Sequence, residues 1–110
     1  MAAALETIRI VDSTDVISKI WELGQYFIDE MKKIIIQSKV KCHMTGVAPM
    51  PYMEFDYGEL SLSKKCVFYG ECAKRGILFH PNHHWYISGA HTQNDIDETL
   101  FVCEQAFKML

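Results

Sequence analysis

One long amphipathic segment constrains the fold of this 110-residue chain more than any other feature. From Val16 to Ile36 the apolar residues recur at three- and four-residue spacings, which is typical of a helix that buries one face. This face consists of Val16, Ile20, Leu23, Phe27, Met31 and Ile34. Gly24 lies close to it and costs about 1 kcal/mol relative to alanine in a helix interior. Either another backbone segment packs closely against this glycine, or the glycine only lowers the helix propensity without a structural reason.

Two further helices are predicted before and after the middle of the chain. The first runs from Ala2 to Ile10 and ends at the polar cluster 12–15, which can supply an N-cap for the long helix. Another runs from Ser61 or Ser63 to Arg75, with Gly76 suited to the residue that follows a helix end. Its predicted apolar stripe is Leu62, Cys66, Tyr69 and Ala73.

The last predicted helix has the clearest beginning. Thr92 suits its N-cap, and Asp95 three residues later completes a variant of the capping box with aspartate in place of glutamate. Carboxylates in a first helical turn usually cap the helix and complement its dipole, so Asp97 and Glu98 have the same structural explanation. The apolar stripe of this helix is Ile96, Leu100, Cys103, Phe107 and Leu110.

Alternating apolar and polar residues predict strands at residues 40–45 and 52–57, joined by a turn from Gly46 to Pro51 into an antiparallel hairpin. Ile77 to Phe79 and Trp85 to Ser88 are predicted as short strands on either side of a loop with Pro81. The predicted fold class is α+β. Its small mixed or antiparallel sheet has three to four short strands, with helices packed on one face.

Length and composition predict one globular domain over residues 1–110. The net charge of −3 and the isolated lysine pairs argue against a nucleic-acid platform. No apolar run is long enough to cross a membrane, and the first residues do not resemble a secretory signal. Four cysteines without paired spacing indicate reduced, buried thiols. We therefore expect a cytoplasmic protein without nucleic-acid or membrane partners.

Four histidines lie within twelve residues: His80, His83, His84 and His91. Structural zinc sites usually need four ligands with paired spacings, which this stretch lacks, so we expect no metal site. Ordinary loop histidines and histidines that line a pocket shared with a partner both remain open. Each cysteine falls in an apolar pattern, and neither a nucleophile elbow nor a glycine-rich phosphate loop is present. The isolated chain is therefore not expected to be an enzyme.

Several segments, taken in order, resemble the small C-terminal domain of class III pyridoxal-phosphate aminotransferases. They are the opening Ala2 to Gly24, the turn Thr45 to Pro51, the strand Gly76 to Leu78, and Ala90-His91-Thr92 through Asp97. The branch that contains glutamate-1-semialdehyde aminomutase is the most similar. The resemblance implies that residues 1–14 form an interdomain helix and that residues 15–110 form the small domain.

In that family the small domain closes over an active site in a homodimer. A large cofactor-binding domain supplies the lysine that holds pyridoxal phosphate. None of the lysines here matches the family's lysine motif, so the resemblance assigns neither catalytic nor cofactor-binding residues to this chain. It implies pyridoxal phosphate for the parent enzyme and none for the chain alone. The resemblance does not identify the substrate. It also does not decide whether the parent enzyme transfers the amino group between molecules or within one molecule.

One departure from the family pattern concerns the substrate. Many class III transaminases place a carboxylate-binding arginine just after the loop that corresponds to Asn82–His84, whereas the only arginines here are Arg9 and Arg75. The resemblance then makes His83, His84 and Trp85 the candidate substrate contacts. Two alternatives remain: a free-standing α+β interaction module and a small metal-binding protein.

Overall fold

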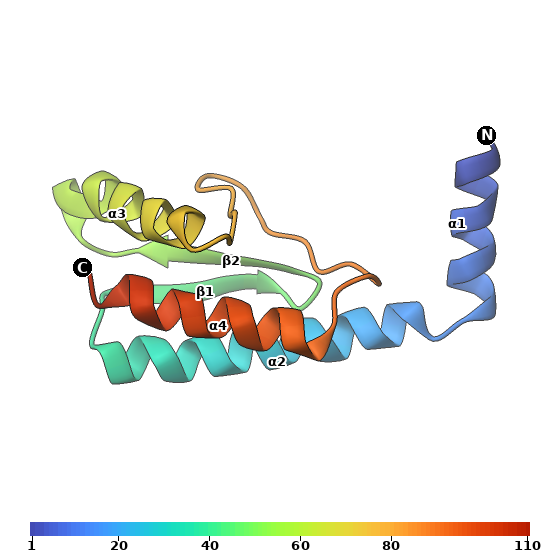
Figure 1. Cartoon of the computed structure of the whole chain (residues 1–110), viewed down its shortest axis with the longest axis horizontal. Coiled ribbons are helices and arrows are strands. Elements are labelled where there is room, and N and C mark those ends of the chain that lie inside the picture. The colour runs from blue at the N-terminus through green and yellow to red at the C-terminus, as the bar shows by residue number, and fades with distance from the viewer.

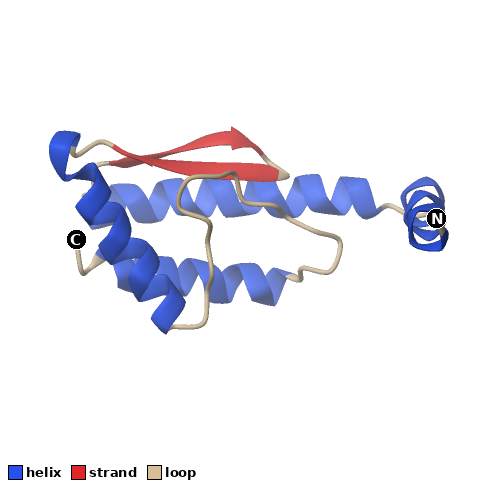
Figure 2. Cartoon of the chain, turned by 90° about the horizontal axis from the view of Figure 1, so that it is seen from above, coloured by secondary structure: helices blue, strands red, loops and turns tan.

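A computed structural model describes residues 1–110, and its architecture is α+β as predicted. The regular elements are, in chain order, α1 (Ala2–Ser13), α2 (Val16–Ser38), β1 (Cys42–Val47), β2 (Met50–Phe55), a 3-10 turn (Gly58–Leu60), α3 (Ser61–Lys74) and α4 (Gln93–Phe107). Helices α2 and α4 lie side by side, the hairpin lies along α2, and a long loop connects α3 to α4 (Figures 1 and 2). None of the helices combines the length and apolar character that crossing a bilayer requires.

Helix α1 stands apart from the rest of the chain. It projects beyond the end of α2 in both views and has no buried residue (Figures 1 and 2). Its large apolar side chains, among them Leu5 and Ile8, are exposed to solvent. The helix extends to Ser13, because Ser13 and Thr14 both donate their hydroxyls to backbone carbonyls four residues earlier. Its stability thus depends on local hydrogen bonds, since no tertiary contact covers it.

Helix α2 supplies one wall of the core, and the close backbone approach considered at Gly24 is present. The buried residues of α2 are Gly24, Phe27, Ile28, Met31 and Ile35. A Cβ atom at Gly24 would lie 1.9 Å from the carbonyl oxygen of Ala48 in the hairpin turn. Glycine is therefore required here because the hairpin backbone occupies the space of a side chain.

The hairpin turn is shorter than predicted. Only Ala48 and Pro49 lie between the strands, and Gly46 pairs with Pro51 inside the ladder rather than in the turn. The core face of the hairpin includes Cys42, Met53 and Phe55, which are all buried. The opposite face is polar, with His43 Nδ1 2.7 Å from an oxygen of Asp56. This division of faces agrees with the alternation in the sequence.

The sheet has two strands, so the prediction of three to four strands was wrong. The segment predicted as a strand at Trp85–Ser88 does run beside β2, where the N–H groups of Trp85 and Ile87 donate to the carbonyls of Pro51 and Pro49 at 2.8 and 2.9 Å. A ladder would also require Pro51 of β2 and Pro49 of the turn to donate in return, and proline has no N–H. The segment therefore forms half of the hydrogen bonds of a third strand. Residues 77–79 are likewise irregular.

The buried face of α3 differs from the predicted stripe. Its buried residues are Phe68, Tyr69 and Cys72, whereas Leu62 is 71% exposed and Cys66 is also exposed. Phe68 stacks on Phe107 of α4 with ring centroids 4.8 Å apart, and it also contacts Phe55 and Tyr69. This aromatic cluster turns α3 so that Cys66 faces solvent. The expectation that all four cysteines are buried was thus wrong for this one.

Helix α4 begins as the sequence predicts. The N–H of Asp95 donates to the Thr92 hydroxyl at 3.2 Å, and the N–H of Thr92 donates to the Asp95 carboxylate at 2.7 Å, which completes the capping box. Four predicted stripe residues, Ile96, Leu100, Cys103 and Phe107, are buried in the core. Leu110 lies beyond the helix end and packs against the core while only partly buried.

Candidate functional site

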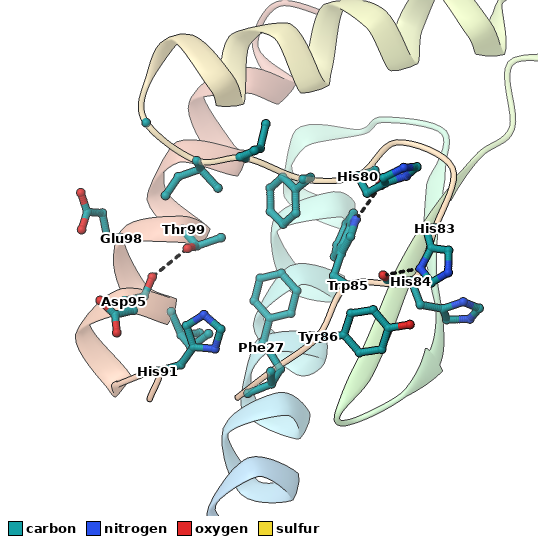
Figure 3. Close-up of a pocket in the computed structure, with 16 residues that line it drawn as sticks. Phe27, His80, His83, His84, Trp85, Tyr86, His91, Asp95, Glu98 and Thr99 are labelled. Carbon is teal, nitrogen blue, oxygen red and sulfur yellow. Dashed lines mark hydrogen bonds between the residues drawn. The ribbon is translucent and has the colours of Figure 1, made fainter. Parts of the chain in front are cut away.

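A pocket of about 650 Å³ lies between the α3–α4 loop, the first half of α4 and Phe27 of α2 (Figure 3). All four histidines of the cluster line it. That a partner shares this pocket stays a prediction. A volume of this size is within the range of small-molecule sites, about 300–1,000 Å³. The apolar part of the wall consists of Phe27, Ile77, Leu78, Phe79, Trp85, Tyr86, Ile87 and Ile96.

His83 and His84 are exposed at one end of the pocket (Figure 3). His83 Nδ1 lies 3.0 Å from the carbonyl oxygen of His84, and its ring is tilted against Tyr86 with centroids 5.8 Å apart. That contact fixes the orientation of the His83 ring and leaves its Nε2 without a protein partner. The His84 ring lies 5.6 Å from that of Tyr52 and makes no hydrogen bond of its own. Both side chains therefore present polar ring atoms to whatever enters the pocket.

Trp85 has a different position from its two neighbours, because it is 7% exposed and belongs to the core. Its ring contacts those of Phe79 and Phe27, with centroids 4.2 and 6.1 Å away. The indole N–H donates to the carbonyl of His80 at 3.1 Å, so the only polar group of Trp85 is already bonded (Figure 3). Trp85 thus shapes the apolar wall of the pocket and offers no hydrogen bond to a ligand.

The α4 end of the pocket is acidic. Asp95 and Glu98 lie one helical turn apart and both line it, together with His91 and Thr99 (Figure 3). Hydrogen bonds from the backbone N–H and the hydroxyl of Thr92 hold the pKa of the Asp95 carboxyl below its usual range. Asp95 is therefore ionised at neutral pH. The structural role predicted for Asp95, as a cap, is correct, but its position at the pocket was missed.

Several pocket residues were not singled out for this role in the sequence. Phe27 was assigned to the buried face of the long helix, and Tyr86 and Glu98 were explained by packing and helix capping. The spacing of Asp95 and Glu98 is a signal that was available, because residues three apart share one helix face. The contribution of Phe27 had no such signal, since it depends on how α2 packs against the loop.

The chain brings no group of three or more histidine, cysteine, aspartate or glutamate side chains close enough together to hold a metal ion. His80 and His83 lie with ring centroids 5.8 Å apart, but His80 uses its Nδ1 to accept the N–H of Asn82 at 3.2 Å. The histidines of the pocket are therefore spread along its wall instead of converging on one point.

The pocket residues do not fit pyridoxal phosphate by themselves. The cofactor needs a lysine amine for its imine linkage and positive charges or backbone N–H groups for its phosphate. Neither lysine nor arginine lines the pocket, whereas the acidic residues Asp95 and Glu98 do. A second chain segment would have to supply the groups that hold this cofactor.

Comparison with curated proteins finds relatives among enzymes that act on amino groups, although no family model matches the chain. It is 30% identical over 102 residues to 3-aminobutyryl-CoA aminotransferase of Cloacimonas acidaminovorans, a match that covers 91% of this chain and 25% of that enzyme. It is 31% identical over 108 residues to aminopentol aminotransferase of Sphingopyxis macrogoltabida, covering 97% and 25%. A glutamate-1-semialdehyde 2,1-aminomutase of Desulfatibacillum aliphaticivorans is 26% identical over 121 residues, covering 100% and 28%.

Solved structures agree with these sequence matches. The FumI protein of Sphingopyxis sp. MTA144, in its pyridoxal-phosphate internal aldimine form, superposes with a TM-score of 0.90 at 29% identity over 98% of this chain and 26% of its own. An omega-transaminase of Sphaerobacter thermophilus shares the fold, with a TM-score of 0.77 at 12% identity over 83% of this chain and 23% of its own. The chain spans about a quarter of the length of the relatives it matches. It is therefore a homologue of the class III pyridoxal-phosphate-dependent aminotransferases and glutamate-1-semialdehyde aminomutases, over the part that forms their C-terminal domain.

Proposed function

We propose that this chain acts as the small C-terminal domain of a pyridoxal-phosphate-dependent aminotransferase or aminomutase. In this role it closes over an active site built by a larger cofactor-binding domain and is not catalytic alone. The observation that supports this most strongly is the superposition of nearly the whole chain on a quarter of the FumI protein. The pocket supports it as well, because it has a ligand-sized volume but no lysine or phosphate-binding group.

We assign residues 1–14 to an interdomain helix and residues 15–110 to the small domain itself. The support is the position of α1, which leaves the body of the chain and buries none of its residues. A helix whose apolar side chains all face solvent gains stability from a partner that covers them. In the proposed enzyme that partner is the large domain.

His83, His84 and Trp85 are proposed as the substrate contacts of this domain. All three line the pocket, which lies on the side of the chain formed by the long loop (Figure 3). The two histidines have ring nitrogens without protein partners and can hydrogen-bond a substrate. Trp85 has its N–H bonded to His80 and contributes shape and apolar surface.

The proposed enzyme is a homodimer that works in the cytoplasm without nucleic-acid or membrane partners. Four free cysteines in a chain of this length favour a reducing compartment. The names of the relatives above refer to different amino compounds. We therefore propose only that the parent enzyme of this chain transfers an amino group, either between molecules or within one.

The reading frame upstream of Met1 gives the test. We expect it to encode a cofactor domain with the Schiff-base lysine, and the protein expressed from the longer frame to show an absorbance band of bound pyridoxal phosphate. Borohydride should abolish that band and fix the cofactor to one lysine of the upstream segment. The 110-residue chain with added pyridoxal phosphate is the control, and it should show neither the band nor transamination.

Two outcomes would contradict the proposal. One is a borohydride-trapped cofactor on a lysine of the 110-residue chain, accompanied by transamination. The other is an upstream segment that encodes no such domain, which would favour a free-standing interaction module with the same fold.

A further inference from the structure

We propose that the free edge of β1 binds an extended acidic peptide, which adds to the hairpin as a further, antiparallel strand. The peptide backbone pairs with Cys42 and Met44, and its acidic residues lie beside Lys39 and Lys41. The loop that lines the pocket runs along the other edge of the hairpin, beside β2. The peptide site is therefore separate from the pocket and goes beyond the proposed function.

The backbone groups that β1 turns outward follow from its pairing with β2. The carbonyl of Lys41 accepts from the N–H of Asp56 at 2.7 Å, so Lys41 faces β2. In an antiparallel ladder, successive residues point their N–H and C=O groups alternately to the two sides of the strand. The groups of Cys42 and Met44 therefore face away from β2, as donors and acceptors for a strand on the outer side.

No other part of the chain covers this edge. Strand β1 contacts α2 and β2 and no other helix or strand. The two strands lie along one border of the molecule, with the core helices on the same side of them (Figure 2). Outside the ladder, no backbone hydrogen bond involves Cys42 or Met44. The edge also has neither a proline nor a bulge, which are common protections against strand addition.

Two lysines at the beginning of this edge favour an acidic strand. Lys39 and Lys41 are exposed, and neither forms an ion pair within the chain. The carboxylates nearby on the polar face of the hairpin, those of Glu54 and Asp56, lie 3.7 and 2.7 Å from the ring nitrogens of His43. Acidic residues on an added strand would give the two lysines opposite charges, which stabilise a cross-strand pair.

The direction of the peptide follows from the preference for antiparallel pairing. Its C-terminal residues then lie beside Lys39 and Lys41, and an earlier apolar residue lies opposite Met44 on the core face. A second copy of β1 matches this edge less well. In the register that joins the two Met44 residues, Lys41 lies opposite Val47 of the other copy and meets no acid. The charges therefore favour the acidic peptide.

A synthetic peptide, Val-Thr-Val-Thr-Val-Glu-Thr-Glu, is a suitable probe. In the antiparallel register its third residue lies opposite Met44, and its first glutamate lies opposite Lys41. We would add it to the isotope-labelled chain and follow amide hydrogen exchange by nuclear magnetic resonance. At saturation, exchange at Cys42 and Met44 should slow about tenfold, whereas the N–H groups of His43 and Thr45 already belong to the ladder and should change little.

N-methylation provides a matched pair of probes. A methyl group on the amide of the third residue removes a donor that faces β1, so it should abolish binding. The same group on the fourth residue lies on the solvent side, so it should leave binding intact and prevent the peptide from pairing with itself.

Reversal of charge tests the role of the lysines. Lys41→Glu should weaken binding of the acidic peptide about threefold and strengthen binding of the peptide with both glutamates replaced by lysine. Lys41 is exposed, so its replacement leaves the core packing in place. Lys74→Glu is the matched control, because Lys74 is on α3, which does not contact β1, and it should change neither affinity.

Four results would overturn the proposal. They are equal binding of the two N-methylated peptides, equal affinity for the acidic and basic peptides, and unchanged exchange at Cys42 and Met44 with excess peptide. The fourth is protection of these two amides in the free chain that increases with protein concentration, which would identify a second copy as the occupant. None of them depends on an upstream cofactor domain, so the peptide site and the proposed function can fail independently.

Discussion

Replacing Gly24 with alanine tests whether the contact between α2 and the hairpin turn holds the two together as tightly as the structure indicates. In an unobstructed helix interior this change stabilises by about 1 kcal/mol. At Gly24 the new Cβ would lie 1.9 Å from the carbonyl oxygen of Ala48, whereas Cβ atoms in proteins rarely come closer than 3.0 Å. The turn must therefore move away by about 1.1 Å, the difference between these distances.

The obstacle is backbone, so the strain cannot be relieved by rotating a side chain. Overpacking of this kind costs about 1–3 kcal/mol, and a clash with a main-chain atom belongs at the upper end. After the helical gain is subtracted, the Gly24→Ala variant should be less stable by about 2 kcal/mol. For a domain of this size that corresponds to a fall in Tm of about 8 °C. Circular dichroism during thermal unfolding measures it, and the denaturant midpoint gives a second estimate.

Gly70 provides a matched control in α3. A Cβ atom there meets nothing within 4 Å, so the same change at Gly70 should raise the stability by up to about 1 kcal/mol. Adding Ala48→Gly should leave the penalty at Gly24 unchanged, because the carbonyl oxygen rather than the Ala48 methyl group is in the way. If Gly24→Ala proved as stable as the parent or more so, the close approach that we describe would be refuted.

Four further changes address other parts of the chain. Cys66 is the one exposed thiol, so we expect one fast equivalent of thiol labelling in the folded protein and four after denaturation, and the fast phase should vanish in Cys66→Ser. Thr92→Ala should destabilise the protein by about 1 kcal/mol, as measured by denaturant unfolding. The pKa of Asp95 is lowered in the folded state, so the contribution of this carboxylate to stability is present above about pH 4 and is lost as the pH falls through the lowered pKa. In a plot of unfolding free energy against pH, Asp95→Asn should therefore flatten this acidic part of the curve. We expect the chain to self-associate through the apolar side chains of α1, so light scattering should show a dimer that Leu5→Glu combined with Ile8→Glu converts to monomer; a monomeric parent at high concentration would contradict this.

The parts of the fold that depend on neighbouring residues could be predicted from the sequence. The beginning of α4 is an example, because Thr92 and Asp95 complete their hydrogen bonds within one turn. The buried face of α3 could not be predicted in the same way. The stripe through Leu62 and Cys66 and the face through Phe68 and Cys72 both have helical spacing and share Tyr69. Only the packing of Phe68 against Phe107 decides between them, and that contact joins residues far apart in the chain.

The candidate site was likewise predicted only in part. The histidine cluster in the sequence lies on the loop that forms the pocket wall, and all four of its members line the pocket. The acidic end of the pocket was not predicted, because helix capping already explained a carboxylate in the first turn of α4. A capping carboxylate can nevertheless use one oxygen for the cap and expose the other to a cavity. Asp95 fills both roles, since its cap uses one oxygen, Oδ2. Assigning it a single role is what made the prediction incomplete.

Pro49 in the hairpin turn and Pro51 in β2 also bear on how this domain can change through evolution. Each of them accepts a hydrogen bond from the loop that forms the pocket wall and returns none. The Tyr52 hydroxyl of β2 also donates to the carbonyl of Pro81 in this loop at 3.0 Å, so isolated hydrogen bonds rather than a strand ladder attach the loop to the hairpin. Mutations in the loop can therefore alter its path without breaking a strand ladder. At these two positions the edge offers no N–H group to a strand from another molecule, which disfavours edge-to-edge pairing there. Replacement of Pro51 by valine would add the missing donor opposite Trp85, extending the sheet toward a third strand at the expense of that adaptability.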